Sequence, residues 1–362
     1  MAQRTTSPTT KKRKAVSRSK PLALLVGNPA AQSGKNDERI VLARELLDKA
    51  GIAHEFLATQ PEGRTATVLE NELAGGKYSQ VIAMGGDGTI SDVARGLFAS
   101  GLAKKVPLGI LPTGTANDIG RSFGLESAEP ALEHNVDVVR EGYETGFDIT
   151  RLTAIDEGGR QLREQIFVDS CGWGLGPKAL RMRNEDRRIV EDIPFVRLFF
   201  RDHAVYAAAA LKAFAESYVF ETKFDVDVVA DGRKLRWEGL TDLVVKSQRI
   251  YAGLWCFDPD SRHDDGLVEV MPFAGRRDWL SKTLLYLDHS GSLSRDLEEA
   301  GLEHARMLKA AKLELTFRTR TRGEPLAAQV DGEEFPEMAR VKLECLKRAL
   351  RLIVPKPKEQ DE

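Results

Sequence analysis

The sequence predicts an α/β domain with a parallel sheet, followed by a domain built mainly of antiparallel strands. Strand-like and helix-like patterns alternate from residue 21 to about residue 148, which is typical of successive β–α units. Beyond that point, short strands with alternating polarity follow one another between turns. The chain of 362 residues is long enough for two domains with separate cores.

The N-terminal region contains four expected strands, at 21–27, 52–59, 80–84 and 106–112. Amphipathic helices are expected between them at 37–51, 63–76 and 89–100. Four β–α units in succession imply a parallel sheet covered by helices on both faces. Because ligands bind beyond the carboxyl ends of such strands, the loops that follow the four strands should meet at one edge.

The C-terminal region begins as a series of short strands. Apolar and polar residues alternate on both sides of Asp231-Gly232 within 224–239, which predicts a hairpin. Further strands are expected at 240–248, 254–259, 266–273, 311–321 and 325–335. So many antiparallel strands predict a sandwich or a barrel. Two helical segments, at 194–217 and 276–292, interrupt them.

These patterns divide the chain into a tail and two domains. The tail is 1–20, the α/β domain is 21–148 and the β domain is 149–337, while 338–355 is expected to return to the first domain. With 42% hydrophobic and 30% charged residues, the composition is that of a globular protein. No run approaches the roughly 18 apolar residues that span a bilayer. Three widely separated cysteines argue against a disulfide framework and a zinc site, and favour a reducing compartment.

Charge is distributed unevenly along the chain. The tail holds seven Lys or Arg residues and no acid, so the rest carries −9 although the whole chain carries −2. We expect the tail to be disordered. The second interpretation is an electrostatic tether to anionic lipid, worth ~1 kcal/mol per basic residue near the surface. Nucleic acid is not an expected partner, because the body is acidic and lacks a basic face with interleaved aromatic residues.

The stretch "MGGDGTISDVA", residues 84–94, places three glycines and one acid between an expected strand and an expected helix. Glycines let a ligand approach the backbone, and N–H groups at a helix start bind phosphate. The earlier stretch "GNPAAQSGKN" is not a P-loop. Six residues separate Gly27 from Gly34, where the P-loop pattern has four, and Lys35 is followed by Asn36.

A second motif, "PLGILPTGTANDIGRSFGL" at 107–125, makes the signal specific. Together with "GGDGTIS" it resembles the catalytic domain of the diacylglycerol kinase family, which includes bacterial lipid kinases and sphingosine kinases. The resemblance extends through "NPAAQSGK", "DDGLVEV" and "VDGEEF" in order, from residue 21 to 355. It implies a Rossmann-like nucleotide domain of the NAD kinase and diacylglycerol kinase type, a C-terminal β-sandwich, and an active site between them.

The resemblance also implies site residues. The ATP phosphates would bind at Gly85, Gly86, Asp87, Gly88, Thr89, Ile90 and Ser91, with further nucleotide contacts from Asn28, Thr59 and Thr115. Asp87 would serve Mg²⁺, directly or through water, beside the phosphates. Helix capping by Asp87 is the alternative, and both can hold. Asn117 and Asp118 are expected near the acceptor substrate.

Two further sites follow from the resemblance. A second, structural Mg²⁺ would take the Asp265 carboxylate and the carbonyls of Arg262 and Leu267, although a plain turn is the alternative. Glu333 would be the general base. Adjacent strand residues point to opposite faces, so only one of Glu333 and Glu334 can enter the cleft, and the resemblance selects Glu333. An exposed hairpin acid is the alternative.

This chain departs from the family pattern in two segments beside the acceptor site. Lys246 and Ser247 stand where the family usually has Asn, and Asp169, Ser170 and Cys171 replace another Asn-containing stretch. The identity of the acceptor lipid depends on these segments.

The expected function is that of an ATP-dependent lipid kinase, cytoplasmic and peripheral to the inner face of the membrane, that converts diacylglycerol to phosphatidic acid. Ceramide or a sphingoid base is the nearest alternative acceptor. NAD kinase shares "GGDGT" but not "LPTGTANDIG". A non-catalytic regulator that binds nucleotide and lipid would be expected to lose its acids, yet Asp87 and Glu333 are present. A homodimer is left open.

Overall fold

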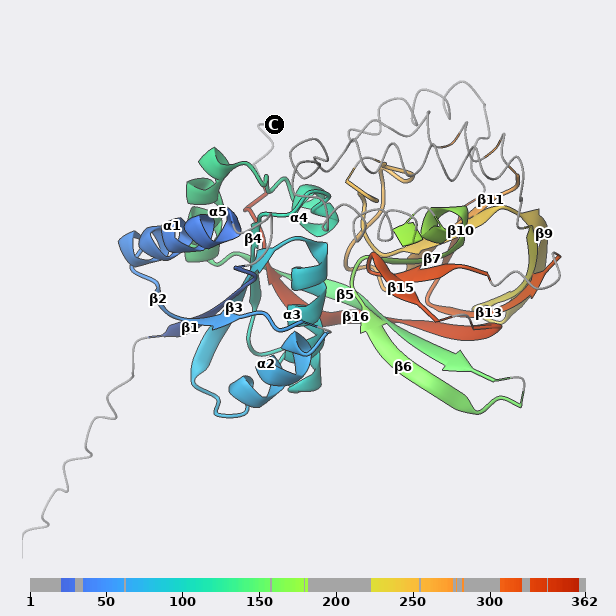
Figure 1. The fold of residues 1–362 in the computed structure, drawn as a ribbon, viewed down its shortest axis with the longest axis horizontal. Coiled ribbons are helices and arrows are strands. Elements are labelled where there is room, and N and C mark those ends of the chain that lie inside the picture. The colour runs from blue at the N-terminus through green and yellow to red at the C-terminus, as the bar shows by residue number, and fades with distance from the viewer. Residues whose placement is uncertain are drawn as a thin grey trace, which may run out of the picture.

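The structure is a computed structural model. It describes residues 21–29, 35–61, 63–156, 158–178, 180–181, 223–253, 255–275, 278, 282, 307–320, 326–336 and 338–357. The tail and the expected helix at 194–217 lie outside these residues, as does most of the expected helix at 276–292. Figure 1 shows two halves side by side, one with helices around strands β1 to β4 and one built of strands.

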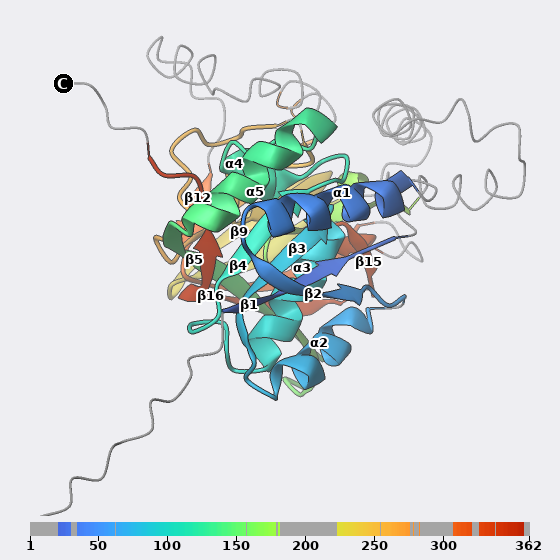
Figure 2. The same cartoon turned by 90° about the vertical axis from the view of Figure 1, so that its left-hand side faces the viewer.

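The N-terminal half is the predicted parallel sheet with helices on both faces. Its strands lie in the order β2-β1-β3-β4. They are β1 (Leu22–Gly27), β2 (Ala53–Ala58), β3 (Tyr78–Gly85) and β4 (Leu108–Pro112). Four helices cover them (Figure 2): α1 (Lys35–Lys49), α2 (Thr65–Leu73), α3 (Asp87–Ala99) and α5 (Leu132–Glu141). The expected strands and helices of this half are thereby confirmed.

Alternation along β1 shows why the helices take two faces. Leu24 and Val26 pack into a core with residues of α2 and α3. Ala23 and Leu25 point the other way and pack with residues of α1 and α5. Because successive strand residues face opposite sides, a strand that is apolar throughout needs a cover on each side.

The C-terminal half is the predicted sandwich. Its strands are β5 (Glu144–Ile155), β6 (Gln161–Phe167), β7 (Ser170–Gly174), β8 (Phe224–Ala230), β9 (Arg233–Leu240), β10 (Asp242–Lys246), β11 (Val268–Phe273), β12 (Leu308–Ala310), β13 (Lys312–Thr319), β14 (Ala328–Val330), β15 (Glu333–Phe335) and β16 (Arg340–Ile353). A buried core that includes Phe167, Trp173 and Leu315 lies between the two sheets. The second sheet has the order β12-β11-β10-β7-β14-β15.

Two details of the strand predictions have different outcomes. The hairpin at Asp231-Gly232 is confirmed, since both residues have positive φ, 47° and 84°, and join β8 to β9. The expected strand at 254–259 is wrong. Its described part forms only an isolated bridge between Tyr251 and Trp255, because the chain there makes a tight turn with Ala252 and Gly253 at positive φ.

Strand β16 joins the two halves. It pairs with β13 and β5 in antiparallel fashion and then, at Leu352, runs parallel to Leu108 of β4. β5 also continues through residue 148. One ten-stranded sheet therefore runs through both halves. This continuity fixes how the loops after β3 and β4 face the second sheet.

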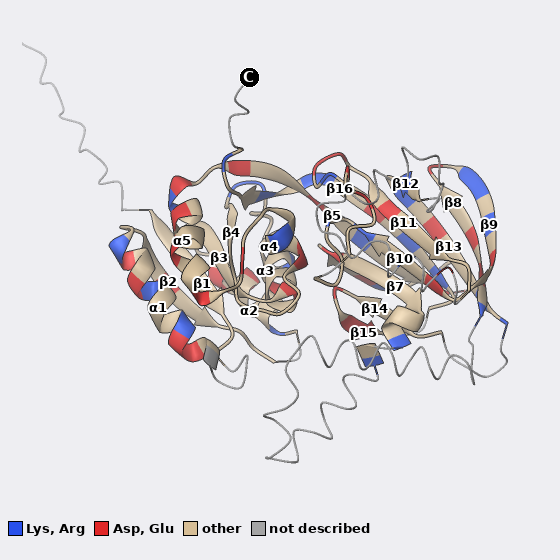
Figure 3. Cartoon of the chain, turned by 90° about the horizontal axis from the view of Figure 1, so that it is seen from above, with Lys and Arg blue, Asp and Glu red and all other residues tan. Residues whose placement is uncertain are grey.

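Positively and negatively charged residues are interspersed along the chain, for example in α1 and in the strands of the C-terminal half (Figure 3). Within the described part of the chain, no helix combines the length and the apolar character needed to cross a membrane.

Candidate active site

Two glycine-containing loops touch where β3 and β4 end. β3 ends at Gly85 and α3 starts at Asp87, with Gly86 between them in an extended conformation. The N–H of Thr113, just after β4, donates to the Gly85 carbonyl at 2.8 Å. A Cβ on Gly86 would lie 3.2 Å from the Cα of Gly114, and one on Gly114 would collide with the backbone of Gly86. The close approach therefore requires glycine at position 114 and leaves little room for a side chain at position 86.

Asn117 shapes the second loop from inside. Its side chain is fully buried and its φ is 52°, in the left-handed region. The amide oxygen accepts from the N–H of Gly114 at 3.0 Å, and the amide nitrogen donates to the Gly114 carbonyl at 2.6 Å. These bonds satisfy a turn that other side chains could not close in the same way. The structure thus places the Asn117 side chain inside the loop, where it is hydrogen-bonded to the backbone of Gly114.

Asp118 begins the short helix α4 (Asp118–Ser122) and connects the two halves. Its buried carboxylate accepts from the N–H of Ala252 at 2.6 Å and from the N–H of Gly253. The N–H of Ile250 also donates to Ser122 Oγ at 3.1 Å. The loop that follows β10 is therefore held against the nucleotide-side loop by hydrogen bonds to α4.

Three carboxyl groups lie close enough here to affect one another. Burial raises the pKa of Asp87 to about 6, while the N–H groups of residues 117–119 act in the opposite direction. Burial, and then the charge of Asp87, raises the pKa of Asp118 well above its usual range. Burial also raises that of Asp169, as do the charges of Asp118, Asp87 and Asp331. Like charges that act on one another in this way disfavour full ionisation, so this cluster favours bound protons or a cation.

Two carboxylate oxygens of this cluster are of the type that a hard cation prefers. Among the described residues, Oδ1 of Asp87 and Oδ1 of Asp169 are buried without a hydrogen-bond partner. In the described ranges, no group of three or more His, Cys, Asp or Glu side chains is placed to hold a metal ion by itself. Mg²⁺ commonly binds through one or two carboxylates together with water and phosphate oxygens, so an incomplete protein cage suits it.

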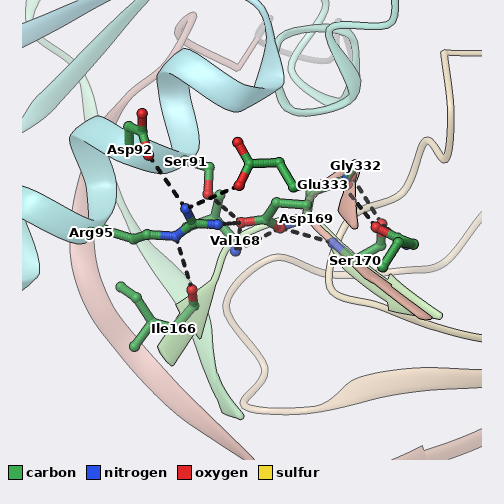
Figure 4. A network of polar contacts seen from close by, with 11 residues as sticks. Ser91, Asp92, Arg95, Ile166, Val168, Asp169, Ser170, Gly332 and Glu333 are labelled. Atoms are coloured by element: carbon green, nitrogen blue, oxygen red, sulfur yellow. Dashed lines mark hydrogen bonds and ion pairs between the residues drawn. The ribbon is translucent and has the colours of Figure 1, made fainter. Parts of the chain in front are cut away.

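Asp331, in the turn between β14 and β15, is the centre of a second network. Its partners Ser91, Arg95 and Val168 to Ser170 are labelled in Figure 4. Its buried carboxylate accepts from the N–H groups of Val168, Asp169 and Ser170 at 3.0 to 3.3 Å. It also accepts from Ser91 Oγ and, at 3.3 Å, from Arg95 Nη2, both on α3. The turn is therefore joined to the helix that starts with the glycine loop.

Glu333 and Glu334 differ in their neighbours. The side chain of Glu333 is 62% exposed, and its Oε2 lies 4.0 Å from Arg95 Nη1 on α3. The carboxylate of Glu334 lies 3.5 Å from Arg181 Nε instead. Of the two acids, Glu333 is thus the one that faces the nucleotide-side helix.

The remaining expected nucleotide residues fall into two groups. Ile90 and Ser91 are buried, Ile90 in the core under the sheet and Ser91 against Asp331. The others lie at the edge formed by the strand ends, and each of them has at least part of its surface exposed except Gly85: Asn28, Thr59, Gly85, Gly86, Gly88, Thr89 and Thr115. The N–H of Thr59 donates to the Gly27 carbonyl, which keeps the loops after β1 and β2 together.

The expected second cation site lies in the turn before β11. Asp265 Oδ1 accepts from the N–H of Leu267 at 2.9 Å. The buried Asp148 carboxylate accepts from the N–H groups of Gly266 and Arg348, each at 2.6 Å. Protein groups alone thus account for the conformation of this turn, which includes Arg262 on the exposed side. A cation at Arg262, Asp265 and Leu267 stays a prediction from the resemblance.

A cavity of about 490 Å³ lies elsewhere, on the large sheet between β5, β8, β13 and β16. None of the expected site residues lines it. Several of its charged residues already pair across it, as Arg151 does with Glu164 and Glu344.

Comparison with known proteins decides the family. The family model named diacylglycerol kinase catalytic domain matches residues 22–152. A diacylglycerol kinase of Staphylococcus carnosus is 32% identical over 251 residues, which cover 69% of this chain and 71% of that protein. This chain belongs to the diacylglycerol kinase catalytic-domain family. A YegS-like lipid kinase of Pseudomonas aeruginosa is 27% identical over 245 residues, 66% of this chain and 68% of that one.

A crystal structure from Bacillus anthracis str. Sterne, assigned as a diacylglycerol kinase, has the same fold. It matches with a TM-score of 0.65 at 18% identity and covers 94% of this chain and 98% of that one. The predicted fold class is thereby confirmed. Membership of the diacylglycerol kinase family makes this chain a lipid kinase, a phosphotransferase with an alcohol acceptor, and the kinase class implies ATP as the phosphoryl donor.

Sequence reasoning missed the residues that join the two halves of the site. Arg95 has no signal of its own in the sequence, because it reads as a polar position on an amphipathic helix. Asp331 reads as a turn residue before Gly332. Asp169 was visible only as a departure from the family pattern. Their part in the site depends on contacts between segments up to 240 positions apart.

Proposed function

We propose that this kinase phosphorylates the hydroxyl of diacylglycerol with ATP and so produces phosphatidic acid. The observation that carries this proposal is the contact between the two glycine loops beside the carboxylates of Asp87 and Asp118. That edge offers N–H groups at a helix start and acids suited to a phosphate-bound cation. The name of the Staphylococcus carnosus relative supports diacylglycerol as the acceptor.

In this proposal the loop from Gly85 to Ser91 holds the phosphates of ATP. Gly86 and Gly114 have no side chains, so phosphate can approach the backbone closely. Asn28, Thr59 and Thr115 contact the rest of the nucleotide, and Asn117 and Asp118 support the loop that faces the acceptor. Asp87, with Asp118 and Asp169 nearby, would hold Mg²⁺, which would neutralise charge on the phosphates.

Glu333 is the proposed general base. The acceptor oxygen attacks the γ-phosphorus while the hydroxyl proton passes to the Glu333 carboxylate, and ADP leaves. The position of Glu333 opposite α3, together with its exposure, favours it over Glu334, which faces Arg181. Asp331 is a weaker candidate, because donors from Ser91, Arg95 and the backbone already surround its carboxylate.

A lipid acceptor also needs the protein to meet a membrane surface. We propose that it does so peripherally, with the basic residues 1–20 adding attraction to anionic lipid. Ceramide and sphingoid bases are the alternative acceptors, because the two segments that depart from the family pattern, Asp169–Cys171 and Lys246–Ser247, are buried beside the site.

The test is transfer of radiolabelled phosphate from ATP to a panel of lipids in mixed micelles: diacylglycerol, ceramide, sphingosine and, as a soluble acceptor, NAD. Label in phosphatidic acid alone is expected. Glu333→Gln should lose ~10²–10⁴-fold in kcat while Glu334→Gln stays active. Label only in ceramide phosphate or NADP would overturn diacylglycerol as the acceptor, and normal turnover by Glu333→Gln would overturn the base.

A further inference from the structure

Arg95 gathers groups from three separate segments of the chain. It lies on α3, two turns after Asp87, and its side chain is 18% exposed. Its Nη1 lies 3.3 Å from Asp92 Oδ1 and its Nη2 lies 3.3 Å from Asp331 Oδ2. Its Nε donates to the carbonyl of Ile166, at the end of β6, at 3.2 Å. Figure 4 shows the guanidinium with dashed lines to Asp92 and to the Ile166 carbonyl.

Glu333 is the fourth neighbour of the same guanidinium, with 4.0 Å between Nη1 and Oε2. The four partners differ in exposure. Asp92 and Asp331 are 15% and 1% exposed, and the Ile166 carbonyl is part of the backbone, so these three hold Arg95 in place. Glu333, at 62%, is the partner with room to move. A planar guanidinium has five N–H donors and can contact all four partners at once, whereas an ammonium has only three donors.

The charges around Arg95 explain how it keeps the Glu333 carboxylate near α3. Three carboxylates, from Asp92, Asp331 and Glu333, lie around one cation. The charges of Glu333 and Asp331 both act on Asp92, and Arg95 opposes them. Without the guanidinium the acids would repel one another, and the exposed Glu333 would turn away from α3 toward solvent.

We propose that Arg95 is a positioning residue, which holds the Glu333 carboxylate at a fixed place relative to the phosphate-binding loop that begins α3. The inference rests on the proposed role of Glu333 as the base. It adds a residue of the nucleotide-side helix to the groups that place the base, so that a contact between the two halves and the position of the base depend on one side chain.

The first experiment separates positioning from binding. Arg95→Ala should lower kcat by about 10- to 100-fold, because small misplacements of a reacting group have effects of this size. The KM for ATP should change by less than about 3-fold, since the loop that binds the phosphates is intact. Arg95→Lys, which keeps the charge but loses the planar fork, should give an intermediate kcat. Arg151→Ala is the matched control, because Arg151 also lies 3.3 Å from a carboxylate within a network of two acids, but on the outer sheet face.

The second experiment is a double-variant cycle. If Arg95 acts through Glu333, then Arg95→Ala in a Glu333→Gln background should lower kcat by less than about 3-fold further. If the kcat of the double variant fell by the product of the two single-variant losses, the proposal would be overturned in favour of a general structural role. Equal losses in kcat and in ATP affinity for Arg95→Ala would have the same meaning. Wild-type kcat for both Arg95 variants would also overturn it. If Arg95→Ala fails to fold, Arg95→Lys alone carries both experiments.

The outcomes also separate this inference from the proposed function. Full activity of Glu333→Gln would remove Glu333 as the base, whatever Arg95 does. Loss of activity in Glu333→Gln with unchanged activity in Arg95→Ala and Arg95→Lys would leave the base in place and remove only the role of Arg95.

Discussion

The hydroxyl of Ser91 donates a hydrogen bond to the carboxylate of Asp331, across 240 positions of the sequence. Ser91 lies in the first turns of the helix that follows the GGDG loop, and Asp331 lies two residues before Glu333. Both side chains are almost fully buried. This bond and the neighbouring one from Arg95 fix the turn that carries the proposed base onto the helix that begins at the phosphate loop.

The first prediction concerns the stability that Asp331 provides. Asp331→Ala should lower the free energy of unfolding by about 3–5 kcal/mol, because it leaves several buried N–H donors without their acceptor and removes one acid from the partly buried Arg95. Urea denaturation measures this. The control is Asp156→Ala, in an exposed turn where the carboxylate accepts from the N–H of Arg160. Equal effects of the two substitutions would contradict a special role for the Asp331 network.

The second prediction follows from the pKa of Asp87, which burial raises from 3.8 to about 6. Between these two values the folded protein binds more protons than the unfolded chain, so this group makes the free energy of unfolding fall as pH rises from about 4 to about 6. The raised pKa values of Asp118 and Asp169 extend the trend upward. Asp87→Asn should remove the contribution of Asp87. The free energy of unfolding of the variant minus that of the wild type should therefore increase as pH rises.

Urea denaturation of wild type and Asp87→Asn at several pH values, without divalent cation, checks this. A stability difference that is the same at the acidic and the neutral end would show that Asp87 is not perturbed. Mg²⁺ should stabilise the wild type more at neutral pH than at acidic pH, because it needs the ionised carboxylate. Asp87→Asn should lose this effect together with most of its phosphoryl transfer.

The third prediction concerns the contact between the glycine loops. Gly114→Ala should destabilise the fold by about 1–3 kcal/mol and weaken ATP binding, because its Cβ would collide with the backbone of Gly86. Gly75→Ala is the matched control, since nothing lies within 4 Å of a Cβ there. Thermal melting and nucleotide titration measure the two effects. A variant at Gly114 that binds ATP normally would argue against the loop contact as part of the nucleotide site.

The fourth prediction concerns the basic tail. Deletion of residues 1–20 removes seven positive charges and should weaken binding to anionic vesicles at low salt. Turnover of lipid dispersed in neutral detergent should change little. Co-sedimentation with vesicles of phosphatidylserine and phosphatidylcholine measures the binding. Unchanged sedimentation after the deletion would rule out the tether.

Local patterns predicted most of the fold. The alternation of apolar residues in β1 and the helical spacing in α3 are properties of short segments, so the sequence displays both directly. The hairpin at Asp231-Gly232 was also predicted, because few residue pairs suit its two positive φ values. The error at 254–259 arose because an apolar run beside a tight turn cannot be told from a strand by its pattern alone.

The sequence by itself determined the fold class, the family resemblance, the glycine loop with Asp87, and the choice of Glu333 as a candidate base. These depend on residue types at fixed local spacing, which a single chain displays directly. Only the tertiary structure decided that Gly86 touches Gly114, that Asp87, Asp118 and Asp169 share one buried environment, and that Arg95 lies between Asp331 and Glu333. Such contacts depend on how the continuous sheet through β4, β16 and β5 brings distant loops together, and neither the spacing nor the polarity of the residues records that.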